Sequence, residues 1–446
     1  MKKTILLSII AGLLCFGIGF GAVTLAGALK APAEPAAVTP EVKNLADGIT
    51  VTAASFYPES GSLMLRLQQM GLALENGQLT DGLLTTELEA VIRELEQLGF
   101  YYDYMGKTST ATEDGTVFGA SADAAGPIGG GAGCTGIHTT GDYIVTDDNS
   151  FYAAALEAQA GDVIFIPGGT VIDLGDMKYV EHNDLVLNPG VILASDRGHN
   201  GSTGAILKIG TVQPILFTLS DEVRLTGLVI QGPDPHVHSL PEEYDPVDGI
   251  RVMGENVHID NCEISGFGSS GILLEEGTLL VDHCYIHHIR GVGAGSGILA
   301  RGGHLAVQYS LFSNCRSGIT VTGGAEFLYA DNNVEVGNSL GALVRLAAGE
   351  TESSTVPGMM ASAACVELRN NTVLGETPLI ALEGMPGKLT VENNLLMLTE
   401  SQYDPVLHYG PEEFREAIRT RILFRNNAFD PTAPQVISWN ETLGEA

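Results

Sequence analysis

The sequence predicts an all-β fold in which short parallel strands stack as the coils of a solenoid, preceded by a small helical element. Two columns of residues that recur at one period near 22 carry this prediction. Helical segments between the strands are absent, which argues against a doubly wound α/β fold. The 446 residues could hold two or three domains, but a repeat array can use this length as one.

The first column is the sixth position of an eight-residue row in which apolar residues alternate. Successive rows have a closest spacing of 22 or 23 residues. Coils of a solenoid stack at the strand spacing of about 4.8 Å, so buried Asn side chains in one column can donate and accept along the stack. We therefore expect the Asn residues to stack inward and the two Cys residues to be neighbours. The column reads Leu228, Cys262, Cys284, Ser310, Asn332, Asn371, Asn394 and Asn427.

The second column consists of Asp or Ser followed by Gly and Ile, at residues 248–250, 270–272, 296–298 and 317–319. The strand that begins there has a largely apolar outward column. A bare apolar column would be an exposed patch, so we expect another part of the chain, the helical element or the C-terminal tail, to cover it. That outward column is Arg251, Leu273, Leu299, Thr320 and Leu343.

The first 30 residues are predicted to be a signal peptide or a signal anchor. Lys2 and Lys3 precede an uncharged stretch over residues 4–29, and Ala26 and Ala28 offer small residues at the spacing that a signal peptidase accepts. The stretch is also long enough to span a bilayer. We expect an exported protein, extracellular, periplasmic or anchored to the outer face of the cell membrane. Membrane contact would occur only through residues 4–29, if they stay uncleaved.

Two connecting regions separate this segment from the solenoid. Residues 31–106 contain an Ala/Pro linker and the small helical element, and residues 107–141, rich in Thr, Ala and Gly, predict a flexible linker. The solenoid is expected over residues 142–431, with a short capped helix at 151–159, and a C-terminal tail over 432–446. The helical element is marked by apolar residues at helical spacing: Leu84, Leu88, Ile92 and Leu95.

Charge and cysteine content limit the classes of function. With 22 Lys+Arg against 54 Asp+Glu, the net charge is −32, which excludes an electrostatic nucleic-acid binder. It also disfavours free polyuronates as substrates, although charges more than about 8 Å apart are screened at physiological salt. Five cysteines lie beyond the export segment, and we expect structural thiols rather than bridges. We expect a monomer.

Three stretches resemble the right-handed parallel β-helix proteins of the pectate-lyase-like superfamily. They are residues 151–156 followed by 161–164, the turn at 188–191, and coils such as 257–264. The resemblance covers roughly residues 142–431 and implies a right-handed parallel β-helix. It does not specify an activity, because the superfamily includes lyases, hydrolases, epimerases, phage tailspikes and adhesins.

The candidate site is the corner before the second column, because its length varies sharply from coil to coil. It is long at 231–248, short at 265–270, intermediate at 287–296 and short at 313–317. A coil with a long corner next to a coil with a short corner leaves a groove about 10 Å wide. Histidines in such a groove suit proton transfer near neutral pH. The catalytic candidates are Asp248, His287, His288, Arg290 and Arg316; the substrate-binding candidates are His236, His238, Ser269 and Ser270.

These residues predict a carbohydrate-active protein that acts on an extended polysaccharide as a lyase, hydrolase or epimerase. One arginine would neutralise a uronate carboxylate, one histidine would move a proton, and Asp248 would orient or protonate. The alternatives are a non-catalytic cell-envelope or adhesion module that binds glycan, and a structural scaffold. His236 and His238 with Asp245 or Asp248 could bind a divalent cation such as calcium, but their spacing matches no specific zinc motif, and no metal is assigned.

Overall fold

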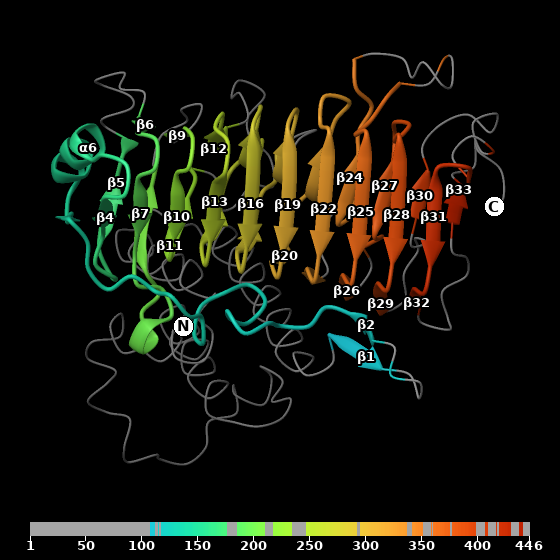
Figure 1. Ribbon diagram of the computed structural model, residues 1–446, viewed down its shortest axis with the longest axis horizontal. Helices are drawn as coiled ribbons and strands as arrows, with labels where there is room; N and C mark the ends of the chain where they lie inside the picture. The colour runs from blue at the N-terminus through green and yellow to red at the C-terminus, as the bar shows by residue number, and fades with distance from the viewer. Residues whose placement is uncertain are drawn as a thin grey trace, which may run out of the picture.

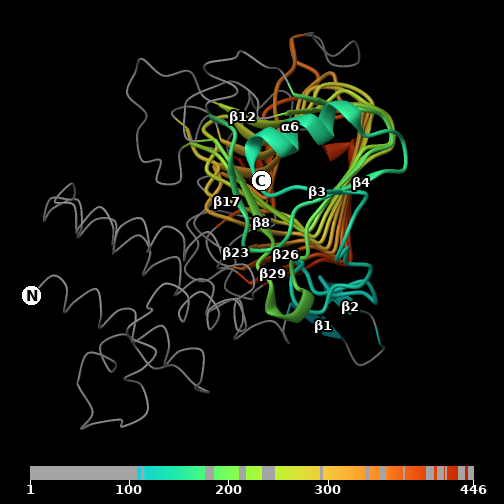
Figure 2. The same cartoon turned by 90° about the vertical axis from the view of Figure 1, so that its left-hand side faces the viewer.

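Three parallel sheets form the walls of a β-helix, and each coil adds one strand to each sheet (Figures 1 and 2). The structure is a computed structural model. It describes residues 108–111, 115, 117–175, 185–209, 217–233, 247–291, 295–336, 341–350, 358, 360–374, 377–397, 406–408, 416, 419–429 and 437–439. The expected signal segment and the helical element lie outside these residues. Within the expected C-terminal tail, residues 437–439 form β33, a strand that pairs with β30 (residues 406–408) of the β-helix, so the solenoid extends beyond residue 431. Within them, no helix is long and apolar enough to cross a membrane.

We name the walls sheets A, B and C in the order in which each full coil visits them. Sheet A has eleven strands: β3 (Tyr143–Ile144), β4 (Val163–Phe165), β7 (Ile192–Ala194), β10 (Arg224–Thr226), β13 (Val257–Asp260), β16 (Thr278–Asp282), β19 (His304–Gln308), β22 (Phe327–Asp331), β25 (Cys365–Arg369), β28 (Lys388–Glu392) and β31 (Ile422–Arg425).

Sheets B and C have ten strands each, stacked in the same direction. Sheet B comprises β5 (Val171–Asp173), β8 (Ala205–Lys208), β11 (Leu228–Gln231), β14 (Glu263–Ser265), β17 (Tyr285–His287), β20 (Leu311–Ser313), β23 (Val334–Val336), β26 (Thr372–Leu374), β29 (Leu395–Met397) and β32 (Ala428–Phe429). Sheet C comprises β6 (Val186–Leu187), β9 (Phe217–Leu219), β12 (Asp248–Val252), β15 (Ser270–Leu274), β18 (Ser296–Ala300), β21 (Ser317–Val321), β24 (Val344–Leu346), β27 (Ile380–Leu382), β30 (Val406–His408) and β33 (Ile437–Trp439).

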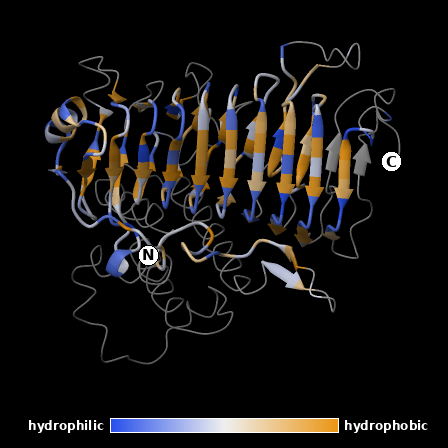
Figure 3. Ribbon diagram, viewed as in Figure 1, coloured by the Kyte–Doolittle hydropathy of each residue, from blue (hydrophilic) through white to orange (hydrophobic). Residues whose placement is uncertain are grey.

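Apolar and polar residues alternate along the strands (Figure 3), and the inward apolar side chains form one continuous core. On β13, for example, Val257 and Ile259 point inward, while His258 and Asp260 lie on the outer face. The helix α6 (Asp148–Glu157) covers the first coil and confirms the expected capped helix. It begins at Asp147, whose side chain accepts from the backbone N–H of Ser150 in a capping box.

The stacked asparagines are confirmed, with one correction of register. Asn333, not Asn332, lies inside, and its Nδ2 donates to Asn371 Oδ1 at 3.0 Å. Asn371 donates in turn to Asn394, and Asn394 to Asn427. Asn332 lies one position earlier, with φ +57, where it accepts from the backbone N–H of Ser121.

The predicted register differs from the observed one in this coil because its pattern of apolar residues is atypical. Phe327 is a half-buried apolar residue on the outer face, whereas Glu335 is fully buried at a position in register with the core residue Phe312. The row predicted from the apolar residues of this coil therefore begins one residue too early. A shift of one residue moves a strand's side chains to the other face.

The cysteines in the described part of the chain are free thiols, as expected. The two inward thiols, Cys262 and Cys284, are neighbours. Burial raises the pKa of Cys284, and a side-chain hydrogen bond with Cys262 raises it further. Burial likewise raises the pKa of Cys315 to about 12. These thiols act as small core residues.

The outward column of sheet C is Arg251, Leu273, Leu299, Thr320 and Arg345. The prediction that Leu343 belongs to it is wrong, because Arg345 pairs with Thr320 and Leu343 lies in the core. Leu273 is buried and Leu299 is half-buried, so the first is covered. The helical element expected to cover them lies outside the described residues.

A segment over residues 117–138, which we call the strap, runs along the corner between sheets A and B (Figures 1 and 2). The strap begins with β2 (Val117–Gly119), which pairs with the preceding strand β1 (Ser109–Ala111). From there it reaches back across the coils, because Gly119 donates to Asn393 O and Gly131 donates to Asn261 Oδ1. Part of the Gly-rich stretch expected to be a flexible linker is thus bound to the β-helix.

Gly130 allows the strap to pack closely against the corner between sheets A and B, so Gly130→Ala should detach the strap. Gly130 has φ +79, and an added Cβ would lie 2.1 Å from the backbone oxygen of His283. Both the backbone conformation and the contact exclude a side chain. We expect hydrogen exchange of residues 121–135 to become at least tenfold faster in Gly130→Ala. Gly115→Ala is the matched control, because an added Cβ there meets nothing within 4 Å; equal rates in both variants would contradict this packing.

Candidate functional site

The predicted corner between sheets B and C is described only in part. His236 and His238 lie outside the described residues. Asp248 begins β12, and its Oδ1 accepts from Ser270 Oγ at 2.6 Å. Ser269 is half-buried beside them and donates its backbone N–H to Val247 O.

The other four predicted residues form two groups at this corner. His287 is 2% exposed and stacks on Tyr285, and its Nδ1 lies 2.8 Å from His288 Nδ1. Arg290 and Arg316 lie on either side of Gly295, where a Cβ would be 2.8 Å from Arg290 Cα and 3.1 Å from Arg316 Cβ. Within the part of the chain that the structure describes, no hydrogen bond joins Asp248 to either group. The corner stays a prediction as a glycan site.

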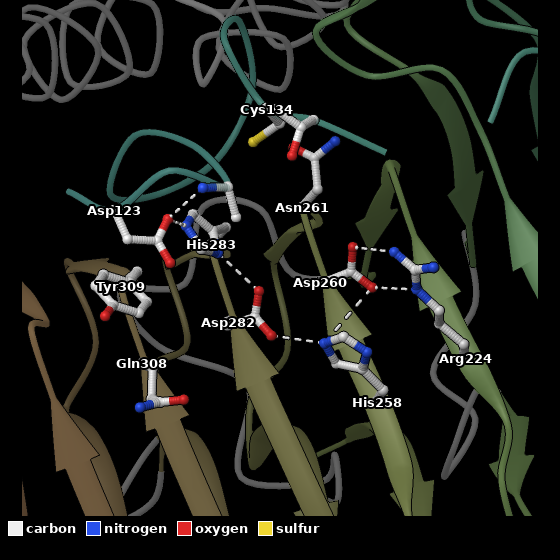
Figure 4. Close-up of a pocket in the computed structure, with 12 residues that line it drawn as sticks. Asp123, Cys134, Arg224, His258, Asp260, Asn261, Asp282, His283, Gln308 and Tyr309 are labelled. Atoms are coloured by element: carbon white, nitrogen blue, oxygen red, sulfur yellow. Dashed lines mark hydrogen bonds and ion pairs between the residues drawn. The ribbon is translucent and has the colours of Figure 1, made fainter. Parts of the chain in front are cut away.

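A second candidate site is a pocket of about 300 Å³ on sheet A, where the strap overhangs the outer face (Figure 4). Strands β10, β13, β16 and β19 form its floor, through Arg224, His258, Asp282 and Gln308. Asp123 and Cys134 of the strap form one wall. The pocket therefore lies between two segments more than 80 residues apart in the sequence.

The corner beside the pocket has an unusual composition. From β10 onward, the residue that follows each sheet A strand has positive φ, a conformation that Gly and Asn adopt most readily. Only in two successive described coils is it a ring residue, His283 (φ +48) and Tyr309 (φ +47). Both line the pocket, with ring centroids 5.0 Å apart. The full column is Gly227, Asn261, His283, Tyr309, Asn332, Asn370, Asn393 and Asn426.

Two histidines share one carboxylate in this pocket. His258 Nε2 lies 2.6 Å from Asp282 Oδ2, and His283 Nδ1 lies 2.7 Å from Asp282 Oδ1. The other ring nitrogen of His283 lies 3.1 Å from Asp123 Oδ1 on the strap. This His–Asp–His group can hold and move a proton, because imidazole titrates near neutral pH.

Burial and hydrogen bonding act in opposite directions on these groups. Burial alone would raise the pKa of Asp282, but hydrogen bonds from His258 and His283 lower it to about 2. Burial alone would lower the pKa of His283, whereas Asp282 and Asp123 together raise it. Asp282 is thus a carboxylate at neutral pH, and the charged form of His283 is favoured.

Arg224 and Asp260 form a second pair at the pocket floor. Arg224 Nε lies 2.7 Å from Asp260 Oδ1, and Nη2 lies 2.9 Å from Oδ2. Thr226 donates to the same carboxylate at 2.7 Å. This bidentate geometry makes the pair strong and directional.

Neither a thiol nucleophile nor a metal site is found in this part of the molecule. Burial raises the pKa of Cys134 to about 11, so its thiol stays protonated at neutral pH. Among the described residues, no group of three or more His, Cys, Asp or Glu side chains could hold a metal ion.

Residues 243–396 match a family model described as a right handed beta helix region. The fold is a right-handed parallel β-helix. No curated protein sequence matches this β-helix.

Solved structures similar to this β-helix have low sequence identity. An alginate lyase from Paenibacillus sp. str. FPU-7 is 13% identical, with a TM-score of 0.48, over 67% of this chain and 98% of that chain. The catalytic unit of an α-1,3-glucanase from Streptomyces thermodiastaticus is 15% identical, with a TM-score of 0.27, over 71% and 72%. The A-module of an Azotobacter vinelandii mannuronan C-5 epimerase is 11% identical, with a TM-score of 0.22, over 68% and 97%.

The sheet A pocket was not predicted from the sequence, although one signal for it is present. The position before the inward column reads Asn in most coils but His283 and Tyr309 in two successive coils. A departure from the local conformational preference at neighbouring positions marks functional sites. Asp123 had no such signal, because only the docked strap brings it to the pocket.

Proposed function

We propose that the chain is an exported carbohydrate-active protein that binds an extended polysaccharide across sheet A and transfers protons to or from it in the sheet A pocket. The observation that carries this proposal is the replacement of the usual Asn by His283 and Tyr309 at the pocket. Neither ring is needed for the turn, since Asn serves the same turn in other coils. The rings therefore serve the pocket.

The outer face of sheet A suits an extended polar polymer. Its strands are about 4.8 Å apart, and one column of polar side chains crosses the pocket and continues along the sheet. Tyr309 adds an aromatic face on which a sugar ring can pack. The column reads Thr226, Asp260, Asp282, Gln308, Asp331, Arg369, Glu392 and Arg425.

The His–Asp–His group supplies the chemistry in this proposal. Protonated His283 is the proton donor, and Asp282, which accepts from both rings, fixes their orientation. Lyase, hydrolase and epimerase reactions all require such proton transfer at a sugar. A non-catalytic glycan-binding module is the second candidate, because the charged groups of the pocket are already joined in a closed set of ion pairs.

A glycan panel tests the proposal directly. Wild-type protein is incubated with neutral glucans, xylans, mannans, amino glycans and polyuronates, and binding, new reducing ends and ultraviolet-absorbing unsaturated products are measured. We expect one extended glycan to bind, and Tyr309→Asn to weaken binding or turnover at least tenfold. Asn suits the positive φ of this position, so the variant removes the ring without straining the turn.

Three further variants locate the site. Glu275→Ala, in an exposed ion pair with Arg301 on sheet C, should leave binding unchanged. His287→Ala and Arg316→Ala test the corner between sheets B and C; if they abolish binding while Tyr309→Asn does not, the site is at that corner. Affinity without turnover would identify a binding module, and no binding by any glycan would reject the proposal.

A further inference from the structure

We infer that the sheet A pocket takes an uncharged sugar rather than a uronate, and that Asp260 determines this specificity by neutralising Arg224. The inference rests on the proposed function and names the substrate class of the same site. Three observations support it: the pairing of the pocket's cations, the excess of acceptors, and the charge of the rest of the sheet.

Every cationic group that lines the pocket already faces a carboxylate. The Arg224 guanidinium is bound by Asp260 through two hydrogen bonds of 2.7 and 2.9 Å. His258 and His283 both contact Asp282. With three carboxylates against one guanidinium, the pocket is negative when the histidines are neutral, and it is at most balanced when both are protonated.

The hydrogen-bonding groups of the pocket also suit hydroxyl donors. Carboxylates accept only. Asp123 lies on the strap wall with 35% of its side chain exposed; its Oδ1 already accepts from the backbone N–H groups of Ala125 and Gly126, which leaves Oδ2 as the acceptor for a ligand. An uncharged sugar offers several O–H donors to such an acceptor. A uronate carboxylate offers only further acceptors, and burying it beside like charge without a partner is costly.

The sheet beyond the pocket continues the same pattern. Arg369 contacts Glu367 at 3.2 Å and Glu392 at 2.6 Å, and Arg425 contacts Glu392 at 2.8 Å. The nearby His138 has a pKa lowered by burial and by Arg224, so it adds no charge at neutral pH. The chain as a whole has a net charge of −32. A polyuronate therefore meets no unpaired arginine of this column, only paired cations, acids and the neutral Thr226 and Gln308.

Asp260→Asn is the decisive variant, because it removes the neutralising charge and keeps the side-chain shape. Binding of uncharged glycan oligomers and of oligogalacturonate is measured by calorimetry for the wild type, Asp260→Asn and Glu383→Gln. We expect the wild type to bind an uncharged oligomer at least tenfold more tightly than oligogalacturonate. Asp260→Asn should bind oligogalacturonate at least tenfold more tightly than the wild type does, and added salt should weaken that gained binding.

Glu383→Gln is the matched control, since Glu383 binds Arg345 at sheet C through two hydrogen bonds of 2.8 and 2.7 Å, outside the sheet A column. It removes the same charge and frees a guanidinium away from the pocket, so its oligogalacturonate affinity should stay within threefold of the wild type. Wild-type preference for oligogalacturonate would overturn the inference, even if Asp260→Asn failed to fold. An equal gain in both variants would overturn the role of Asp260. Absence of binding by every glycan would instead reject the proposed function.

Discussion

Replacing His283 with Asn is expected to lower turnover of the responsive glycan by about 10²–10⁴-fold, the usual loss when a general acid or base is removed. The free energy of unfolding should change by no more than about 1 kcal/mol. Asn suits the φ of +48 at this corner better than His does, which offsets the lost contacts with Asp282 and Asp123. Steady-state rates and urea unfolding measure the two effects separately.

The pH profile distinguishes proton transfer from simple positioning in the same experiment. The wild-type rate should fall as the pH rises through the raised pKa of His283, because the protonated ring is lost. That fall should be missing from the residual activity of His283→Asn. An unchanged profile, or a similar loss of rate in Glu383→Gln at sheet C, would show that His283 takes no part in the chemistry.

Replacing Asn371 with Leu is expected to lower the free energy of unfolding by about 3 kcal/mol. Asn371 Oδ1 accepts from both the backbone N–H and the side chain of Asn333, and its Nδ2 donates to Ala330 O and Asn394 Oδ1. Leu fills the space but leaves buried donors of Asn333 without this acceptor. Each such group costs about 1–3 kcal/mol. Urea unfolding monitored by circular dichroism measures the loss.

Asn332 and Asn333 provide a matched pair for the corrected register. Asn333→Leu should destabilise as strongly as Asn371→Leu, because Asn333 accepts from the backbone N–H of Ser310 in the core. Asn332→Gly should cost less than about 1 kcal/mol, since Gly tolerates positive φ and only the contact with Ser121 is lost. The reverse order would mean that Asn332 is the inward residue.

The repeat could be predicted from the sequence because it is a local pattern of apolar alternation with one recurring residue. Cys262, Cys284, Asn371 and Asn394 all lie where the column placed them. The prediction was wrong at Asn332 and Leu343, where one coil has Phe327 outside and Glu335 inside. There, pairing with the neighbouring coils decides the register, and a single row does not contain that information.

The sheet A pocket was harder to predict because it depends on contacts distant in sequence. His258, Asp282 and His283 meet through the stacking of adjacent coils, which the period implies. Asp123 reaches them only because the strap crosses the corner, and nothing in its Gly-rich sequence specifies that path. The other candidate site was predicted from corner length. Corner length indicates where long loops form a groove, but it contains no information about a site on a flat sheet face.

The strap also has a consequence for how the chain folds. A solenoid in which each coil touches only its neighbours can form and fray one coil at a time. Here Ala120 bonds to Thr372, 252 residues away, while Gly131 bonds to Asn261. The strap leaves the ribosome before any of these coils exists, so it can dock only after most of the array has been synthesised. Its docking then couples early and late coils into one cooperative unit, at the cost of slow, non-local closure.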